Sequence, residues 1–113
     1  MTDRLYVHVP CAMLDQVLPL LIEQQLQPEI AFKWFDLDRP PAEVSQWGRQ
    51  LADAGLAVHV HAPFMDLNPG AIDPLVRDVT RRRFDRTLQL AGLLKARLIV
   101  FHPGFFRWHY GGR

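Results

Sequence analysis

The chain has 113 residues, of which 49% are hydrophobic and 22% charged, a balance that excludes disordered and fibrous proteins. The formal net charge of +1 gives no support for nucleic acid or an anionic membrane as a partner. No apolar run approaches the roughly 18 residues that a membrane span needs, and the single cysteine, Cys11, excludes an internal disulfide. We therefore expect one cytoplasmic domain over residues 1–113.

The predicted elements alternate between strand and helix along the chain. Residues 5–9 alternate as a strand does, and apolar residues recur at helical spacing from Met13 to Leu26. A second strand is predicted over residues 29–35, then a helix that ends at Gly55, and a third strand over residues 56–61. Asp73-Pro74 begins the longest helix, and a fourth strand covers residues 97–102. This alternation predicts an α/β fold with a parallel sheet and right-handed crossovers.

The two faces of the predicted sheet differ in polarity, which distinguishes two architectures. One face is apolar and requires helices against it: Leu5, Val7, Val9, Ile30, Phe32, Trp34, Leu56, Val58, Val60, Ile99 and Phe101. The other is smaller or polar: Tyr6, His8, Ala31, Lys33, Ala57, His59, His61, Leu98, Val100 and His102. A doubly wound sheet is apolar on both faces, whereas a barrel interior becomes polar toward the carboxyl ends of its strands. We expect the amino-terminal half of a (β/α)8 barrel, with four strands and three helices, because a whole barrel needs about 250 residues.

Three strands end in a histidine followed closely by a proline. The sequences are His8-Val9-Pro10, His61-Ala62-Pro63 and His102-Pro103-Gly104. Carboxyl ends of parallel strands meet at one rim, where barrel enzymes have their active sites. We therefore expect imidazoles to gather there, with His61 and His102 as candidate metal ligands.

Further positions on the polar face are candidates for substrate binding. They are His8, Lys33 and His59, and no catalytic residue is assigned. His59 lies one layer deeper than His61, and Lys33 faces inward by strand parity. Phosphate-loop and dinucleotide-binding glycine patterns are absent from the sequence, so no nucleotide cofactor is expected.

The chain resembles the xylose isomerase-like TIM barrels, a superfamily that includes the endonuclease IV-type nucleases (AP endonuclease family 2) and many sugar or sugar-phosphate isomerases and epimerases. The resemblance rests on the run from His61 to Asn68 and on Val100-Phe101-His102-Pro103-Gly104. It implies a divalent metal, either Zn, Mn or Mg, in the complete protein. In the nuclease branch, the histidines matching His61 and His102 bind metal. In the isomerase branch, carboxylates and a histidine from later strands usually do so.

Three functions follow as expectations. The first is the amino-terminal half of a metal-dependent isomerase or epimerase for a sugar or sugar phosphate, inactive as this chain alone, with its base and carboxylate ligands beyond Arg113. The second is metal-dependent hydrolysis of abasic DNA. It is less favoured because Phe64 stands where the nucleases commonly carry tyrosine and no further histidine directly follows the His-Pro-Gly sequence. The third is a non-catalytic half-barrel that self-associates through its open sheet edges.

Overall fold

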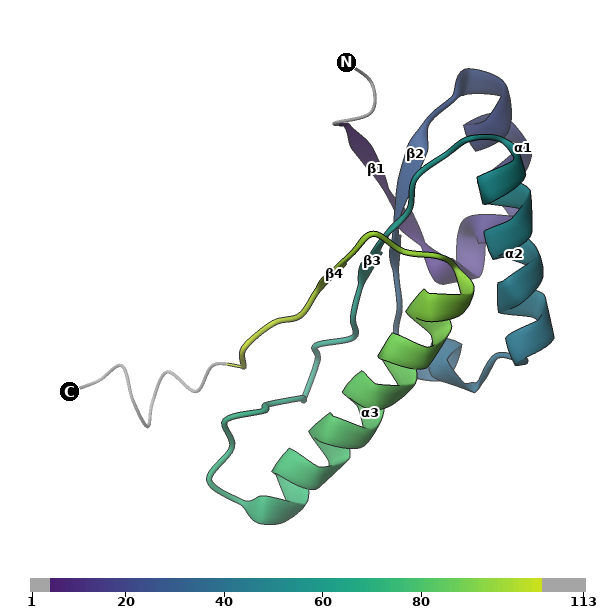
Figure 1. Ribbon diagram of the computed structural model, residues 1–113. Helices are drawn as coiled ribbons and strands as arrows, with labels where there is room; N and C mark the ends of the chain where they lie inside the picture. The colour runs from purple at the N-terminus through teal and green to yellow at the C-terminus, as the bar shows by residue number, and fades with distance from the viewer. Residues whose placement is uncertain (1–4, 105–113) are drawn as a thin grey trace.

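The chain folds into a parallel sheet with its helices on one side (Figure 1). The computed structural model describes residues 5–104. The strands are β1 (Tyr6–Pro10), β2 (Gln27–Ala31), β3 (His59–His61) and β4 (Leu98–Val100). The α-helices are α1 (Leu14–Gln24), α2 (Pro41–Asp53) and α3 (Pro74–Leu93), and two short 3-10 helices are η2 (Cys11–Met13) and η3 (Trp34–Asp38).

The strand order identifies the architecture. All three neighbouring pairs are parallel, and the order β1-β2-β3-β4 follows the chain without a reversal. A doubly wound sheet reverses its order at a switch point and carries helices on both faces. Here α1, α2 and α3 lie on the same side (Figure 1). The four parallel strands and three helices are therefore arranged as in one half of a barrel, as the sequence predicts.

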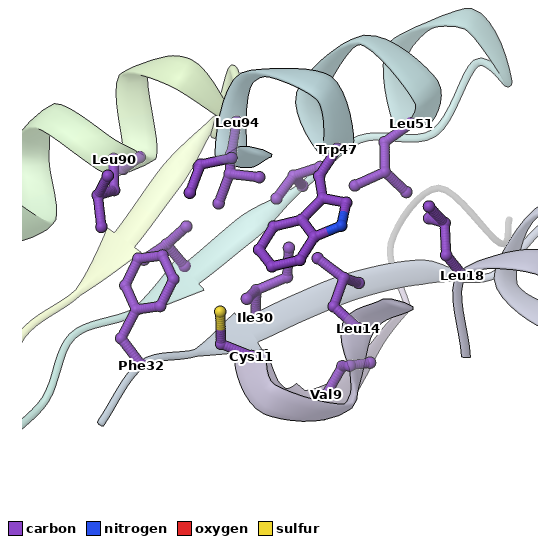
Figure 2. Close-up of a cluster of buried hydrophobic side chains, with 14 of the residues drawn as sticks. Val9, Cys11, Leu14, Leu18, Ile30, Phe32, Trp47, Leu51, Leu90 and Leu94 are labelled. Atoms are coloured by element: carbon purple, nitrogen blue, oxygen red, sulfur yellow. The ribbon is translucent and has the colours of Figure 1, made fainter. Parts of the chain in front are cut away.

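The core lies between the sheet and the three helices (Figure 2). Trp47 of α2 packs in this cluster, and its indole N–H donates to Asp15 Oδ1 at 2.6 Å. The cluster contains Val9, Cys11, Leu14, Leu18, Leu21, Ile30, Phe32, Leu37, Val44, Trp47, Leu51, Leu56, Val58, Val60, Leu90, Ala91 and Leu94. Six of the predicted core-facing positions are thus confirmed as buried: Val9, Ile30, Phe32, Leu56, Val58 and Val60.

The predicted second strand extends too far. β2 ends at Ala31, and the chain turns into η3, where Trp34 is 64% exposed. A local hydrogen bond explains the turn, because the Lys33 backbone N–H donates to Asp36 Oδ2 at 2.8 Å. The Arg86 guanidinium of α3 then donates to the Leu37 carbonyl oxygen at 2.8 Å. One local and one long-range side-chain hydrogen bond thus override the strand propensity of an aromatic run.

Three other predicted core positions are exposed: Phe101, which follows β4, and Leu5 and Val7 at β1, with Leu5 exposed to 70%. β1 is an edge strand, and no helix among residues 5–104 lies beyond it. The sequence pattern identified the correct face of β1, but half a barrel leaves that part of the face uncovered. None of the helices within residues 5–104 has the length and apolar character required to cross a membrane.

Candidate functional site

Two histidines meet at the carboxyl end of the sheet. His61 is the last residue of β3, and His102 follows β4 by two residues. Their Nε2 atoms lie 2.9 Å apart. His61 Nδ1 lies 2.9 Å from the carbonyl oxygen of Ala62, so it carries the proton and donates to that oxygen. His61 Nε2 is then unprotonated and carries a lone pair, which accepts a hydrogen bond from His102 Nε2–H. The sequence prediction that these two imidazoles gather at the rim is confirmed by this contact.

Phe64 forms an aromatic wall beside the two histidines. Its ring stacks on the His102 ring with centroids 4.2 Å apart and planes inclined by 12°. The same ring meets His61 edge-on at 5.6 Å. Phe64 therefore limits the rotation of both imidazoles, a role that the sequence argument missed. Its place three residues after His61 was the only available signal.

A glycine allows the second histidine to approach the first. Gly104 has φ +81°, and a Cβ on it would lie 2.9 Å from Asn68 Cα and overlap the Asn68 side chain. Asn68 is itself held by α3, because its backbone N–H donates to Thr80 Oγ1 at 2.9 Å. Glycine is the residue that fits both the close contact and the left-handed backbone. The glycine of His102-Pro103-Gly104 thus links the end of β4 to the loop that follows His61.

His8 and His59 lie deeper on the same open face. The register aligns His8 with Glu29 and Glu29 with His59, one side-chain row before His61. The His59 ring stacks on Tyr6 with centroids 3.5 Å apart and planes inclined by 13°. Since β2 separates β1 from β3, the Tyr6 side chain must cross β2 to make this contact. The structure therefore separates the predicted residues into a rim pair, His61 and His102, and a deeper row.

Lys33 does not lie on a strand. β2 ends at Ala31, so Lys33 lies just beyond the strand, where its backbone stays extended (φ −103°, ψ 170°) and its side chain is exposed. The inward direction of Lys33 stays a prediction. The neighbouring Phe32 backbone N–H donates to the His61 carbonyl oxygen at 2.9 Å, which places this segment near the level of the rim. Contact of Lys33 with substrate stays a prediction.

Comparison with known proteins identifies the family. The sequence pattern of the family described as xylose isomerase-like TIM barrel matches residues 22–112. The chain belongs to this family. A solved structure with the same fold is the TTHB071 protein from Thermus thermophilus, from a crystal soaked with ZnCl2, with 29% sequence identity and a TM-score of 0.79. The match covers 89% of this chain and 40% of that one, so this chain spans less than half the length of that neighbour. No curated protein sequence matches the chain.

The histidine pair of this xylose isomerase-like chain suits part of a metal site. His61 presents an unprotonated Nε2, and His102 does so in its other tautomer, so both are chemically able to bind one ion. Catalytic zinc sites commonly use three protein ligands. Within residues 5–104, no group of three or more histidine, cysteine, aspartate or glutamate residues is placed to hold a metal. The described residues therefore offer two candidate ligands for such a set.

Cys11 does not belong to the site. It is buried beneath α2, and Figure 2 shows its sulfur directed into the apolar cluster. Burial, with a smaller contribution from the Asp36 carboxylate, raises the pKa of the Cys11 thiol to about 12. A thiol in this environment is a poor nucleophile and a poor metal ligand.

Proposed function

We propose that the chain is the amino-terminal half of a divalent-metal-dependent isomerase or epimerase for a sugar or sugar phosphate, and that it is inactive by itself. The contact that supports the proposal most directly is the 2.9 Å approach of His61 Nε2 to His102 Nε2 at the rim. Barrel enzymes carry their active sites at this end of the strands. The proposal includes a cytoplasmic location, in keeping with the one buried free thiol.

The proposal gives the described residues different tasks. His61 and His102 hold a Zn, Mn or Mg ion together with carboxylates from the rest of the barrel. When bound, such an ion polarises a carbonyl or hydroxyl of a sugar and favours proton transfer at the adjacent carbon. His8, His59 and Lys33 bind the substrate. Phe64 keeps the two rim imidazoles directed toward the ion.

The test follows the hydrogen that the reaction exchanges. In the complete protein with metal, we expect deuterium from D2O to enter a candidate sugar at the carbon next to its carbonyl, detected by NMR. The 113-residue chain alone should give no exchange. Exchange that persists after complete removal of metal would refute the proposed chemistry, and exchange by the chain alone would refute its inactivity.

A second candidate is metal-assisted hydrolysis of the phosphodiester at abasic sites in DNA. The convergence of the two Nε2 atoms favours it, because histidines at these positions bind metal in the nuclease branch. His61→Ala and His102→Ala in the complete protein should then abolish both metal binding and cleavage of an abasic duplex. His8→Ala, which changes a histidine one row away from the rim pair, is the control for metal binding. Metal retained by both variants would instead assign the ligands to carboxylates, as in the isomerase branch.

A third candidate is a non-catalytic half-barrel that pairs with itself. Two features support it: the open face of the sheet, and the two edge strands, β1 and β4. Val7 of β1 and Leu98 of β4 are exposed apolar residues that a second copy could cover. Sedimentation velocity should show a dimer that forms as concentration rises and that Leu98→Lys weakens. A chain that stays monomeric at high concentration would exclude this candidate.

A further inference from the structure

A carboxylate lies between two imidazoles on the open face of the sheet. Glu29 of β2 is in register with His8 of β1 and with His59 of β3. Neighbouring parallel strands are about 4.8 Å apart, and in-register residues point to the same face. Glu29 is the one acidic residue in the four described strands. The sequence argument did not single it out, because the register that aligns it with the histidines is a property of the fold.

Glu29 has no described partner that would make it part of the framework. Within residues 5–104 no hydrogen bond or ion pair joins Glu29 to another side chain, whereas Asp15, Asp36 and Glu43 each accept a bond. Glu29 is also only half-buried. A half-buried carboxylate between two imidazoles is an acceptor that a ligand can reach.

The residues around Glu29 leave it open on one side. Toward the amino end of the strands, the Tyr6 ring crosses β2 and stacks on His59. Toward the rim, the next residue of β2 on this face is Ala31, which is in register with His61. A methyl group is therefore the only β2 side chain between Glu29 and the level of the histidine pair.

We infer that Glu29 binds hydroxyl groups at the end of a neutral sugar remote from His61 and His102, and selects an unphosphorylated sugar over a sugar phosphate. This inference rests on the proposed function and deepens it. An ionised carboxylate only accepts hydrogen bonds, so it suits the O–H donors of a polyol. A phosphate carries negative charge and acceptor oxygens, so the same position repels it. His8 and His59 flank Glu29 and can donate to or accept from the same hydroxyls.

The test titrates the 113-residue chain with D-fructose and, separately, with D-fructose 6-phosphate, and follows the imidazole NMR signals of His8 and His59. We expect D-fructose to shift both signals and to bind at least about tenfold more tightly than its phosphate. Glu29→Gln keeps the shape and removes the charge, so it should weaken D-fructose binding by roughly tenfold and narrow the preference between the two sugars. Glu23→Gln, the same change on an exposed residue of α1, should behave as the unchanged chain does.

A second pair of variants tests access to the carboxylate. Ala31→Leu should block the path to Glu29 and abolish the D-fructose shifts, whereas Ala52→Leu on the exposed side of α2 should leave them unchanged. Absence of D-fructose binding, equal affinity for the two sugars, or unaltered affinity in Glu29→Gln would each overturn the inference. A Zn²⁺ titration read at His61 and His102 tests the metal part of the proposed function separately.

Discussion

Replacement of Gly48 by alanine should reveal how closely α2 and α3 pack. A Cβ at position 48 would overlap the Leu93 carbonyl oxygen and lie 3.1 Å from Leu94 Cα. Both are backbone atoms, so no side-chain rotation relieves the overlap and the helices must separate. Overpacking of this kind costs about 3 kcal/mol at the upper end of its range, and the better helix propensity of alanine returns about 1 kcal/mol. We expect the free energy of unfolding to fall by about 2 kcal/mol.

The matched control is Gly92→Ala. Gly92 lies in α3, and a Cβ there would meet nothing within 4 Å. In this variant the free energy of unfolding should rise by up to about 1 kcal/mol, from helix propensity alone. In thermal unfolding followed by far-UV circular dichroism, Gly48→Ala should lower Tm by about 10 °C, and Gly92→Ala should raise it by several degrees. A Gly48→Ala chain that melts at or above the unchanged chain would refute the close packing of α2 on α3.

Three further predictions concern the thiol and the loop behind the histidine pair. Cys11, with its pKa raised to about 12, should resist iodoacetamide until the chain unfolds, and rapid alkylation of the folded chain would contradict this. The free energy of unfolding should fall as pH rises above 9.0, the ordinary pKa of a thiol, because the thiol loses its proton first in the unfolded chain. Gly104→Ala should disturb the imidazole NMR signals at the rim, and adding Asn68→Gly should restore them only in part, because the positive φ remains. Thr80→Val should lower the urea midpoint by leaving the Asn68 N–H without its acceptor, whereas Thr87→Val removes only a bond within α3; equal effects would count against the Thr80 contact.

The sequence predicts the fold well where periodicity and burial agree. The central strand positions Ile30, Val58 and Val60 are apolar in a pattern of two and are buried as expected. The sequence predicts that the second strand continues past Ala31, because residues 32–35 are rich in aromatic side chains, as strands often are. The chain turns there instead, because the Lys33 backbone N–H donates to the Asp36 carboxylate. That bond is local, but the Arg86 contact that supports it joins residues far apart in the chain. Such contacts are not visible in a strand propensity.

The candidate site divides in the same way. The meeting of His61 and His102 was predictable, because strands that are neighbours in a parallel sheet end at a common rim. The deeper row was only half predictable. His8 and His59 follow from parity, but their alignment with Glu29 depends on register, and the stack of Tyr6 on His59 spans an intervening strand. Neither can be derived from the order of residues alone.

The hydroxyl of Thr80 has an influence beyond its own helix. It donates to the Val76 carbonyl oxygen and accepts from the Asn68 N–H, and Asn68 packs against Gly104 just after His102. A substitution at Thr80 can therefore change the position of His102 relative to His61 although Thr80 contacts neither imidazole. The geometry of the rim pair thus depends in part on a helix that supplies neither histidine.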